Sequence, residues 1–132
     1  MIFVDSNVPM YLVGASHPNK DRSRLLLQQA VADGEILVTD AEVLQEILHR
    51  YVAIGRPEAI ADAMAATLGL VDEVFPIERA DVLRAQSLLE ETRLSARDAV
   101  HAAVMRRHGI ARILTFDQAF DGLADLVRIT SR

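Results

Sequence analysis

Short apolar runs alternate with longer amphipathic stretches along the whole chain. The runs are rich in β-branched and aromatic residues, which is typical of strands buried on both faces of a sheet. The stretches between them carry apolar residues at helical spacing. We expect strands over residues 1–4, 36–38, 74–77, 113–116 and 126–130. We expect helices over 8–14, 21–32, about 57–68, about 79–92 and 95–108, another between 39 and 55, and a helical turn over 118–123.

A few residues mark where these elements begin and end. Thr39–Glu42 has the spacing of a capping box, so a helix is expected to open there. Ser95 is expected to cap the N-terminus of the helix that follows it. Gly69 is expected to close its helix as a left-handed C-cap. Pro76 cannot donate a ladder hydrogen bond, so its strand is expected at a sheet edge.

The alternation of strands and helices predicts an α/β fold with right-handed crossovers and a mostly parallel sheet. The length suits one domain, residues 1–132, with a single core. The first strand is short and wholly apolar, so we expect it near the centre of the sheet. Parallel strands place their carboxyl ends at one edge, where ligands bind in open α/β sheets.

Composition narrows the classes of partner. The net charge of −5 disfavours a simple nucleic-acid-binding module, although bound cations reverse the local charge at a metal site. The chain has no cysteine, which excludes disulfides and thiolate metal sites and fits a reducing cytoplasm. No apolar run reaches the ~18 residues that span a membrane, so we expect a cytoplasmic protein without membrane association.

Four acidic residues are candidates for one functional site. Asp5 and Asp117 each follow a predicted strand. Glu46 lies at the border of an apolar helical stripe, where the alternative is an exposed pair with Arg50. Asp98 lies in the first turn of its helix, where acids are common because of the helix dipole. Each position has an ordinary structural explanation, but the fold directs all four toward one edge.

Clustered carboxylates repel one another unless a cation lies between them. Mg²⁺ and Mn²⁺ prefer carboxylate and water oxygens as ligands. Two such ions ~3.5–4 Å apart activate water and stabilise the leaving oxygen in phosphodiester cleavage. The sequence therefore favours metal-dependent phosphodiester chemistry without a covalent nucleophile.

Two histidines follow acids at helical spacing. His49 comes three residues after Glu46, and His101 three after Asp98. Such pairs occur in di-iron carboxylate bundles, but the alternation of strands and helices disfavours that fold. We expect His101 to be a hydrogen-bonded group beside the site and His49 to be a surface residue.

Four segments together resemble the PIN-domain ribonucleases, specifically the VapC toxins of bacterial toxin–antitoxin pairs. They are residues 3–7, 39–48, 94–103 and 113–117. The resemblance covers nearly the whole chain and implies strand order 3-2-1-4-5 with helices on both sides. It also implies a metal-dependent endoribonuclease with an acidic site of Asp5, Glu46, Asp98 and Asp117.

The resemblance further assigns roles and partners. Asp5 and Asp98 are implied as direct metal ligands, with Glu46 and Asp117 acting partly through waters. Ser6, Asn7 and Thr115 fall where the family places supporting polar groups. The implied cofactor is Mg²⁺, with Mn²⁺ as the alternative. The implied partners are an RNA substrate, a second copy of the chain, and a cognate VapB-like antitoxin that occludes the site.

Some features depart from this pattern or compete with it. Many relatives carry a further acid two residues after the fourth one, where this chain has Ala119, followed by Asp121. One metal or two therefore stays open. Glu42 competes for the role of Glu46, although its capping-box position makes it the weaker candidate. The basic segment around Asp98 is expected to include phosphate contacts among Arg93, Arg97, Arg106, Arg107 and Arg112.

Two other functions are weighed against the ribonuclease. One is a non-catalytic PIN-like interaction module, which would leave repelling carboxylates without use. The other is a phosphotransfer or phosphatase domain with Asp5 as the acceptor. Receiver-like sites need a lysine late in the chain, but the only lysine is Lys20. Haloacid-dehalogenase-like sites need a second Asp where this chain has Asn7.

Overall fold

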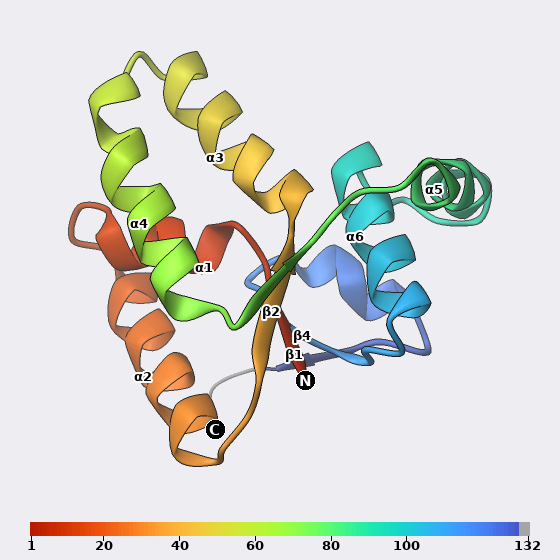
Figure 1. Cartoon of the computed structure of the whole chain (residues 1–132), viewed down its shortest axis with the longest axis horizontal. Helices are drawn as coiled ribbons and strands as arrows, with labels where there is room; N and C mark the ends of the chain where they lie inside the picture. Colours follow the sequence, from red (N-terminus) through yellow and green to blue (C-terminus); the bar gives the residue numbers. More distant parts are fainter. Residues whose placement is uncertain (130–132) are drawn as a thin grey trace.

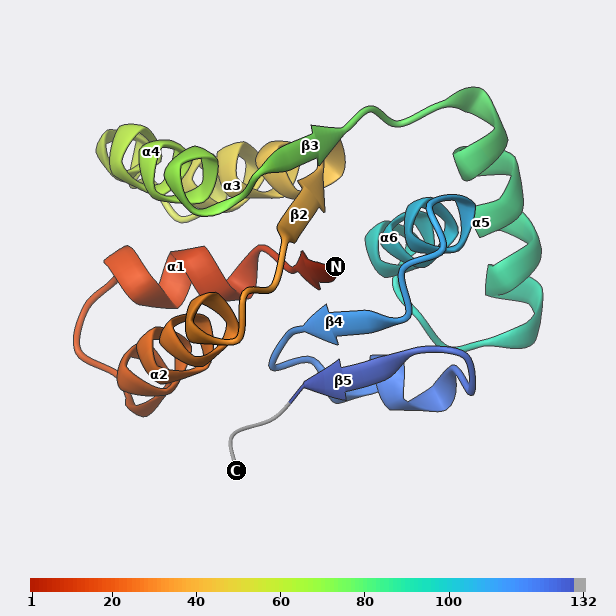
Figure 2. The same cartoon turned by 60° about the horizontal axis from the view of Figure 1, so that its bottom comes forward.

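Five parallel strands form one sheet in the order β3-β2-β1-β4-β5 (Figures 1 and 2). The structure is a computed structural model that describes residues 1–129. The strands are β1 (Ile2–Val4), β2 (Leu37–Asp40), β3 (Glu73–Phe75), β4 (Arg112–Leu114) and β5 (Val127–Ile129). The expected strand order, the central first strand and the edge position of β3 are all confirmed. Thr130, the last residue of the fifth predicted strand, lies outside the described residues.

Helices cover both faces of this sheet. They are α1 (Asn7–Val13), α2 (Pro18–Ala32), α3 (Ala41–Ala53), α4 (Ile60–Leu70), α5 (Arg79–Glu91) and α6 (Ala96–Arg107), with 3₁₀ turns η1 (Pro57–Ala59) and η2 (Gln118–Gly122). The side chains of β1 alternate between two cores. Ile2 and Val4 pack with α1 and α2, whereas Phe3 packs with α3, α5 and α6. Figure 2 shows α1 and α2 on one side of the strands and α5 and α6 on the other.

The capping box predicted at Thr39–Glu42 is wrong. β2 continues to Asp40 because Thr39 and Asp40 pair with Val74 and Phe75 of β3. Thr39 therefore lies in the strand, and its hydroxyl donates a hydrogen bond to the carbonyl oxygen of Val4 at 2.8 Å. Asp40 is the N-cap of α3, with its Oδ1 accepting from the backbone N–H of Val43 at 2.9 Å. The strand thus delivers Asp40, not Thr39, to the carboxyl edge.

The C-cap predicted at Gly69 is also wrong. α4 runs past this glycine to Leu70 and ends at Val71, which is extended. In residues 1–129 the left-handed glycines are Gly34, Gly55 and Gly109. Tertiary packing thus extended α4 by two residues beyond the expected end at 68. α2 also starts earlier than expected, at Pro18, because the His17 side chain accepts from the N–H of Asn19.

Part of the apolar pattern faces solvent instead of the core. Leu48 and Val52 of α3 are 42% and 64% exposed, and Val82, Leu83 and Leu89 of α5 are also exposed. The core side of α3 is formed by Val43, Ile47 and Tyr51. Within residues 1–129, none of the helices is long and apolar enough to cross a bilayer.

Candidate active site

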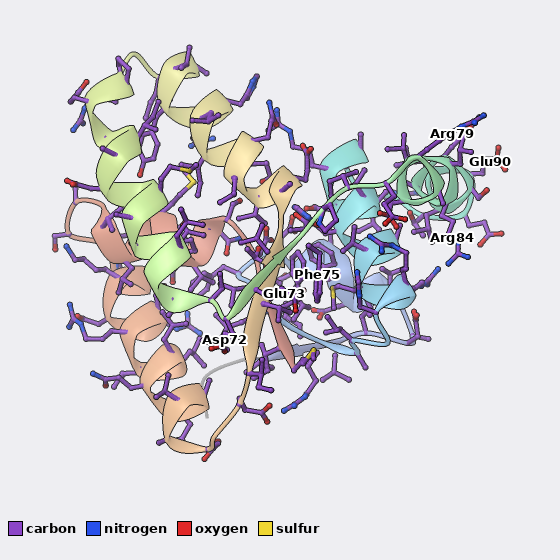
Figure 3. The ribbon with its side chains drawn as sticks, in the orientation of Figure 1. Asp72, Glu73, Phe75, Arg79, Arg84 and Glu90 are labelled. Carbon is purple, nitrogen blue, oxygen red and sulfur yellow. The ribbon has the colours of Figure 1, made fainter. Side chains whose placement is uncertain are left out.

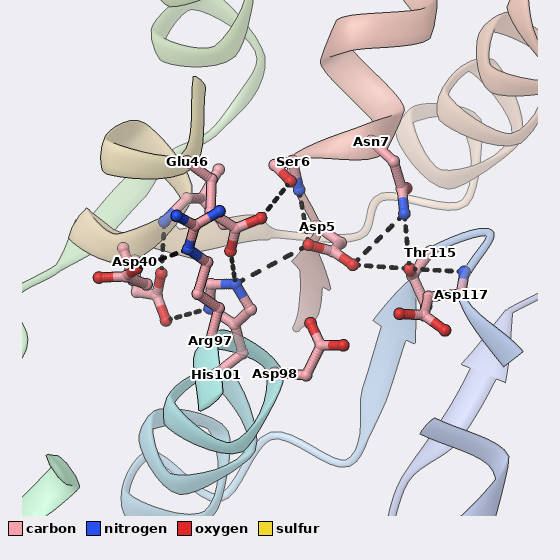
Figure 4. Close-up of polar contacts among 12 residues, drawn as sticks. Asp5, Ser6, Asn7, Asp40, Glu46, Arg97, Asp98, His101, Thr115 and Asp117 are labelled. Atoms are coloured by element: carbon pink, nitrogen blue, oxygen red, sulfur yellow. Dashed lines mark hydrogen bonds and ion pairs between the residues drawn. The ribbon is translucent and has the colours of Figure 1, made fainter. Parts of the chain in front are cut away.

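The four predicted carboxylates meet in one cavity at the carboxyl edge of the sheet (Figure 4). The cavity has a volume of about 410 Å³. Asp5 follows β1, Glu46 lies on α3, Asp98 lies in the first turn of α6, and Asp117 follows β4. Four separate elements therefore deliver the acids, as expected for parallel strands that end at one edge. Their placement is observed, while their chemical roles remain a prediction.

Asp5 is held from both of its carboxylate oxygens. Thr115 donates its hydroxyl to Oδ2 at 2.7 Å, and the backbone N–H of Ser6 donates to Oδ1 at 2.7 Å. Asn7 donates its side-chain amide to the Thr115 hydroxyl at 3.1 Å and so braces it. Burial raises the pKa of Asp5, and this effect outweighs the opposing hydrogen bonds and the nearby His101 charge. The orientation of this carboxylate is thus fixed by the fold.

Glu46 is also held from two directions. Ser6 donates its hydroxyl to Oε2 at 2.7 Å, and His101 places Nε2 2.5 Å from Oε1. The alternative exposed pair of Glu46 with Arg50 does not form. Burial alone would raise the pKa of Glu46, but the hydrogen bond and charge of His101, with the Ser6 hydroxyl, lower it below its ordinary value.

His101 is fully buried and lies between two carboxylates. Its Nδ1 is 2.8 Å from Oδ2 of Asp40, and its ring packs against Phe3 at 5.3 Å between centroids. Burial alone would lower the pKa of His101, but hydrogen bonds to Asp40 and Glu46 and their charges raise it well above its ordinary value. Both ring nitrogens therefore lie at hydrogen-bonding distance from a carboxylate oxygen. The expectation of a hydrogen-bonded group beside the site is met.

Asp40 is the residue that sequence reasoning missed. It was interpreted as part of a helix-opening motif, and it does cap α3 through Oδ1. Its other oxygen, Oδ2, binds His101, so one buried carboxylate performs both tasks. The available signal was Thr39, a β-branched residue that favours extension of the strand beyond Val38, since a strand that continues to residue 40 carries its acid to the same edge as Asp5.

Asp98 and Asp117 complete the acidic wall. Ser95 caps α6 as expected, accepting the backbone N–H of Asp98 at 3.1 Å. Burial, the charge of Asp5 and contact with Asp117 raise the pKa of Asp98 to about 7. Asp117 is oriented by the N–H of Ala119, which donates to its Oδ1 at 2.9 Å. Burial and the neighbouring acids together therefore keep a proton on Asp98 near neutral pH.

The donor set fits a hard divalent cation. The cavity offers carboxylate oxygens from four residues, the ligands that Mg²⁺ and Mn²⁺ prefer. Oxygens of Asp5 and Glu46 and a nitrogen of His101 lie within 4.8 Å of one another, close enough for one ion to contact neighbouring groups. Because both His101 nitrogens are engaged, the ring fits a supporting role behind Glu46 rather than coordination.

Comparisons with known proteins agree with this architecture. The model of the PIN domain family matches residues 2–126. The chain is a PIN domain. It is 59% identical over 130 residues to Ribonuclease VapC13 of Mycobacterium tuberculosis, covering 98% of this chain and 99% of the relative. The resemblance to VapC proteins seen in the four motifs is thereby confirmed.

Solved structures share the PIN fold at low sequence identity. The crystal structure of Mycobacterium tuberculosis VapC20, a sarcin–ricin loop cleaving toxin, has a TM-score of 0.80 at 24% identity and covers 99% of this chain and all of its own. VapBC2 from Rickettsia felis, bound to a DNA fragment from the promoter, has a TM-score of 0.75 at 14% identity and covers 98% of both chains. These likenesses support the fold.

Two competing acids lie away from the cavity of this PIN domain. Asp121 receives a bidentate pair from Arg128 at 3.0 and 3.1 Å, so its carboxylate is engaged elsewhere and does not replace the acid absent at Ala119. Glu42 is not part of the cavity wall and lies 3.7 Å from Arg97. Glu46, not Glu42, therefore faces Asp5.

The five arginines considered for phosphate binding divide into two groups. Three are engaged in bidentate pairs: Arg106 with Asp125, Arg107 with Asp81, and Arg112 with Glu35. Arg97 instead lies at the cavity, and its one ion pair within residues 1–129 is the 3.7 Å contact with Glu42. Arg93 is exposed near the start of α6. The PIN domain thus keeps one of these cations at the acidic site itself.

Proposed function

We propose that this PIN domain, residues 1–132, is a metal-dependent endoribonuclease and the toxin of a toxin–antitoxin pair. The observation that carries the proposal is the single cavity lined by Asp5, Glu46, Asp98 and Asp117. The 59% identity to a protein named as a ribonuclease supports RNA as the substrate. Burial and the neighbouring acids raise the pKa of Asp98 to about 7, and a bound cation would relieve the repulsion among these carboxylates.

The resemblance to the VapC toxins supports different roles for the four acids. Asp5 and Asp98 are the direct ligands in this proposal, while Glu46 and Asp117 act partly through waters. A bound Mg²⁺ or Mn²⁺ lowers the pKa of water and neutralises phosphate charge during in-line displacement. Ser6 and His101 hold Glu46, and Thr115 holds Asp5, so these oxygens need little reorganisation when RNA binds.

Arg97 is the cation placed to meet the substrate. Its side chain lines the acidic cavity, and its contact with Glu42 at 3.7 Å is long and partly exposed. Such pairs contribute little to stability, so a phosphate displaces Glu42 at small cost. Arg97 therefore holds a phosphate of the RNA opposite the carboxylates.

The partners follow from the VapC relatives. The Rickettsia felis structure is a VapBC complex, which supports a VapB-like antitoxin for this chain. The antitoxin occludes the acidic cavity, and the toxin acts as a homodimer in the cytoplasm. A size-exclusion and light-scattering measurement on the purified chain, with and without its antitoxin, tests both parts of this assignment.

The decisive experiment incubates the purified, antitoxin-free protein with total cellular RNA. Reactions contain Mg²⁺, Mn²⁺ or EDTA, with Asp98→Asn as the matched inactive variant, and new 5′ ends are mapped by sequencing. Discrete ends that require both metal and Asp98 are expected. Ends that persist in EDTA or in Asp98→Asn would contradict the proposal. No ends, together with no carboxylate-dependent Mn²⁺ binding by calorimetry, would favour a non-catalytic interaction module.

A further inference from the structure

A second cavity adjoins the acidic one, between α1 and α3. It also has a volume of about 410 Å³. Its own wall is formed by Met10 and Tyr11 of α1, by Arg50 and Tyr51 of α3, and by Ile54 just beyond α3. A cavity of this size lies within the range that binds small ligands or parts of larger ones.

The two cavities are continuous. Ser6, Asn7, Glu46 and Arg97 line both of them. Figure 4 shows the Ser6 hydroxyl bonded to Glu46, with Arg97 next to Glu46. A chain-like substrate whose phosphate reaches Asp5 and Asp98 therefore has its neighbouring unit at the second cavity.

The second cavity is less acidic than the first. Four carboxylates line the first cavity, and of these only Glu46 also lines the second, whose own wall is apolar and aromatic and carries Arg50. Arg50 is exposed, and among residues 1–129 its side chain has no ion pair or hydrogen bond partner. Its guanidinium is thus available, and so is most of that of Arg97.

Tyr11 is held in place at this wall. Its ring stacks on His17 with centroids 4.7 Å apart and meets the edge of Phe116 at 5.4 Å. A ring already fixed by neighbours loses little conformational freedom when a ligand packs against it. Single-stranded RNA is recognised by such aromatic rings, on which unstacked bases pack, together with arginines that contact its phosphates.

We propose that the cavity between α1 and α3 binds the nucleotide next to the scissile phosphate, with its base against Tyr11 and its outer phosphate on Arg50. This assignment rests on the proposed ribonuclease function and adds the subsite that selects sequence. Arg97 lies between the subsite and the acidic cavity and spans the two phosphates. The base is taken from a single strand, because a base inside a duplex has its faces stacked on its neighbours.

The first test measures binding through its salt dependence. The probe is a 5′-fluorescein single-stranded RNA carrying the mapped cleavage sequence, bound to protein that also carries Asp98→Asn. Arg50→Ala is expected to reduce the slope of log K against log salt by about 0.7, the contribution of one phosphate contact on a single strand. Arg84→Ala is the matched control, because Arg84 is an exposed arginine of α5, on the far side from α1 and α3 (Figure 3). An unchanged slope in Arg50→Ala would overturn the phosphate contact.

The second test removes the base instead of the protein side chain. The same RNA is made with an abasic site at each position flanking the cleaved bond. At one position the abasic site is expected to lower kcat/KM of the wild-type protein roughly tenfold, the effect of losing one stacked base. Tyr11→Leu is expected to show the same loss on intact RNA and no further loss on that abasic RNA, because the two changes remove one interaction.

The outcomes separate this subsite from the ribonuclease proposal. If the wild-type protein cleaves no RNA with metal, both fall together. If the protein cleaves RNA, but Tyr11→Leu lowers kcat/KM on abasic RNA by as much as it does on intact RNA, only the subsite proposal is wrong. Circular-dichroism melting of Tyr11→Leu checks its fold, and Arg50→Ala, at an exposed position, provides a variant that does not disturb packing. If Tyr11→Leu and Arg50→Ala keep RNA binding but are no longer inhibited by the antitoxin, the cavity between α1 and α3 binds the antitoxin instead of RNA. That result would overturn the proposal.

Discussion

His101 holds Glu46 from the buried side of the site, with Nε2 of the ring 2.5 Å from Oε1 of the carboxylate. The other ring nitrogen is bound to Asp40, so the ring is held from both sides. This pair of contacts fixes the ring behind the carboxylates. It also makes the orientation of Glu46 depend on α6 and on the end of β2.

We expect His101→Gln to weaken Mn²⁺ binding and kcat/KM by roughly 10- to 100-fold, the usual cost of removing a group that orients a ligand. His49→Gln is the matched control, since His49 is exposed on α3. Isothermal titration calorimetry with Mn²⁺ reports the binding directly. Asp40→Asn is expected to weaken binding in the same direction, because it removes the charge that orients the ring. Mn²⁺ affinity equal to wild type in both variants would refute the positioning role.

Asp98→Asn is expected to stabilise the metal-free protein, and more so at pH 8 than at pH 5. The pKa of Asp98 is raised from 3.8 to about 7 in the folded chain, so the folded protein binds this proton more tightly than the unfolded chain does. Stability from this group is present below about pH 4 and is lost as the pH rises through 7. Asparagine cannot ionise and avoids that loss. Differential scanning calorimetry in EDTA at both pH values measures the difference, and a lower melting temperature for Asp98→Asn at pH 8 would contradict it.

Glu46 and Glu42 are expected to behave differently although both lie on α3. Glu46→Gln removes a charge that faces Asp5 across the cavity and is expected to abolish detectable cleavage. Glu42→Gln changes a group outside the cavity wall and is expected to retain cleavage within about threefold of wild type, since its partner Arg97 is held only loosely. Single-turnover cleavage of the mapped RNA compares the two. Equal losses would mean that Glu42 shares the metal role.

Arg107 and Arg106 are neighbours in sequence but differ in what they hold. Asp81, the partner of Arg107, is fully buried, whereas Asp125, the partner of Arg106, is half exposed. Arg107→Ala is expected to cost about 3 kcal/mol of unfolding free energy, because it leaves a buried carboxylate unpaired. Arg106→Ala is expected to cost about 0.5 kcal/mol. Urea denaturation measures both, and comparable costs would contradict the burial argument.

The arrangement of the fold was largely predictable from local pattern. Uninterrupted apolar strands such as Ile2–Val4 indicate burial on both faces, and the alternation with helices then fixes a parallel sheet. The strand order came from the family resemblance, not from periodicity. The ends of the helices were less predictable because packing decides them. Glycine is the usual residue at a helix C-terminus, yet α4 continues through Gly69 to Leu70.

The site was predictable in its members but not in its internal contacts. Strand ends and helix starts place Asp5, Asp98 and Asp117 without knowledge of the tertiary structure. The bond between Asp40 and His101 joins residues 61 positions apart, and no local pattern encodes it. The arginines show the same limit. Which of them is free for RNA depends on whether a carboxylate from a distant element lies opposite, as Glu35 does for Arg112.

The pairing of β1 with β4 has a consequence during synthesis of the chain. Asp5 accepts a hydrogen bond from Thr115, which lies 110 positions later in the chain. The acidic cavity is lined by both Asp5 and Asp117, so it needs residues from both of these segments. A ribosome makes the chain in order, so a nascent or truncated product that stops before β4 has the first carboxylate but not the last. Such a fragment is unable to assemble the acidic cavity. The acidic cavity, and with it any nuclease activity, therefore forms only after β4 and Asp117 have been synthesised.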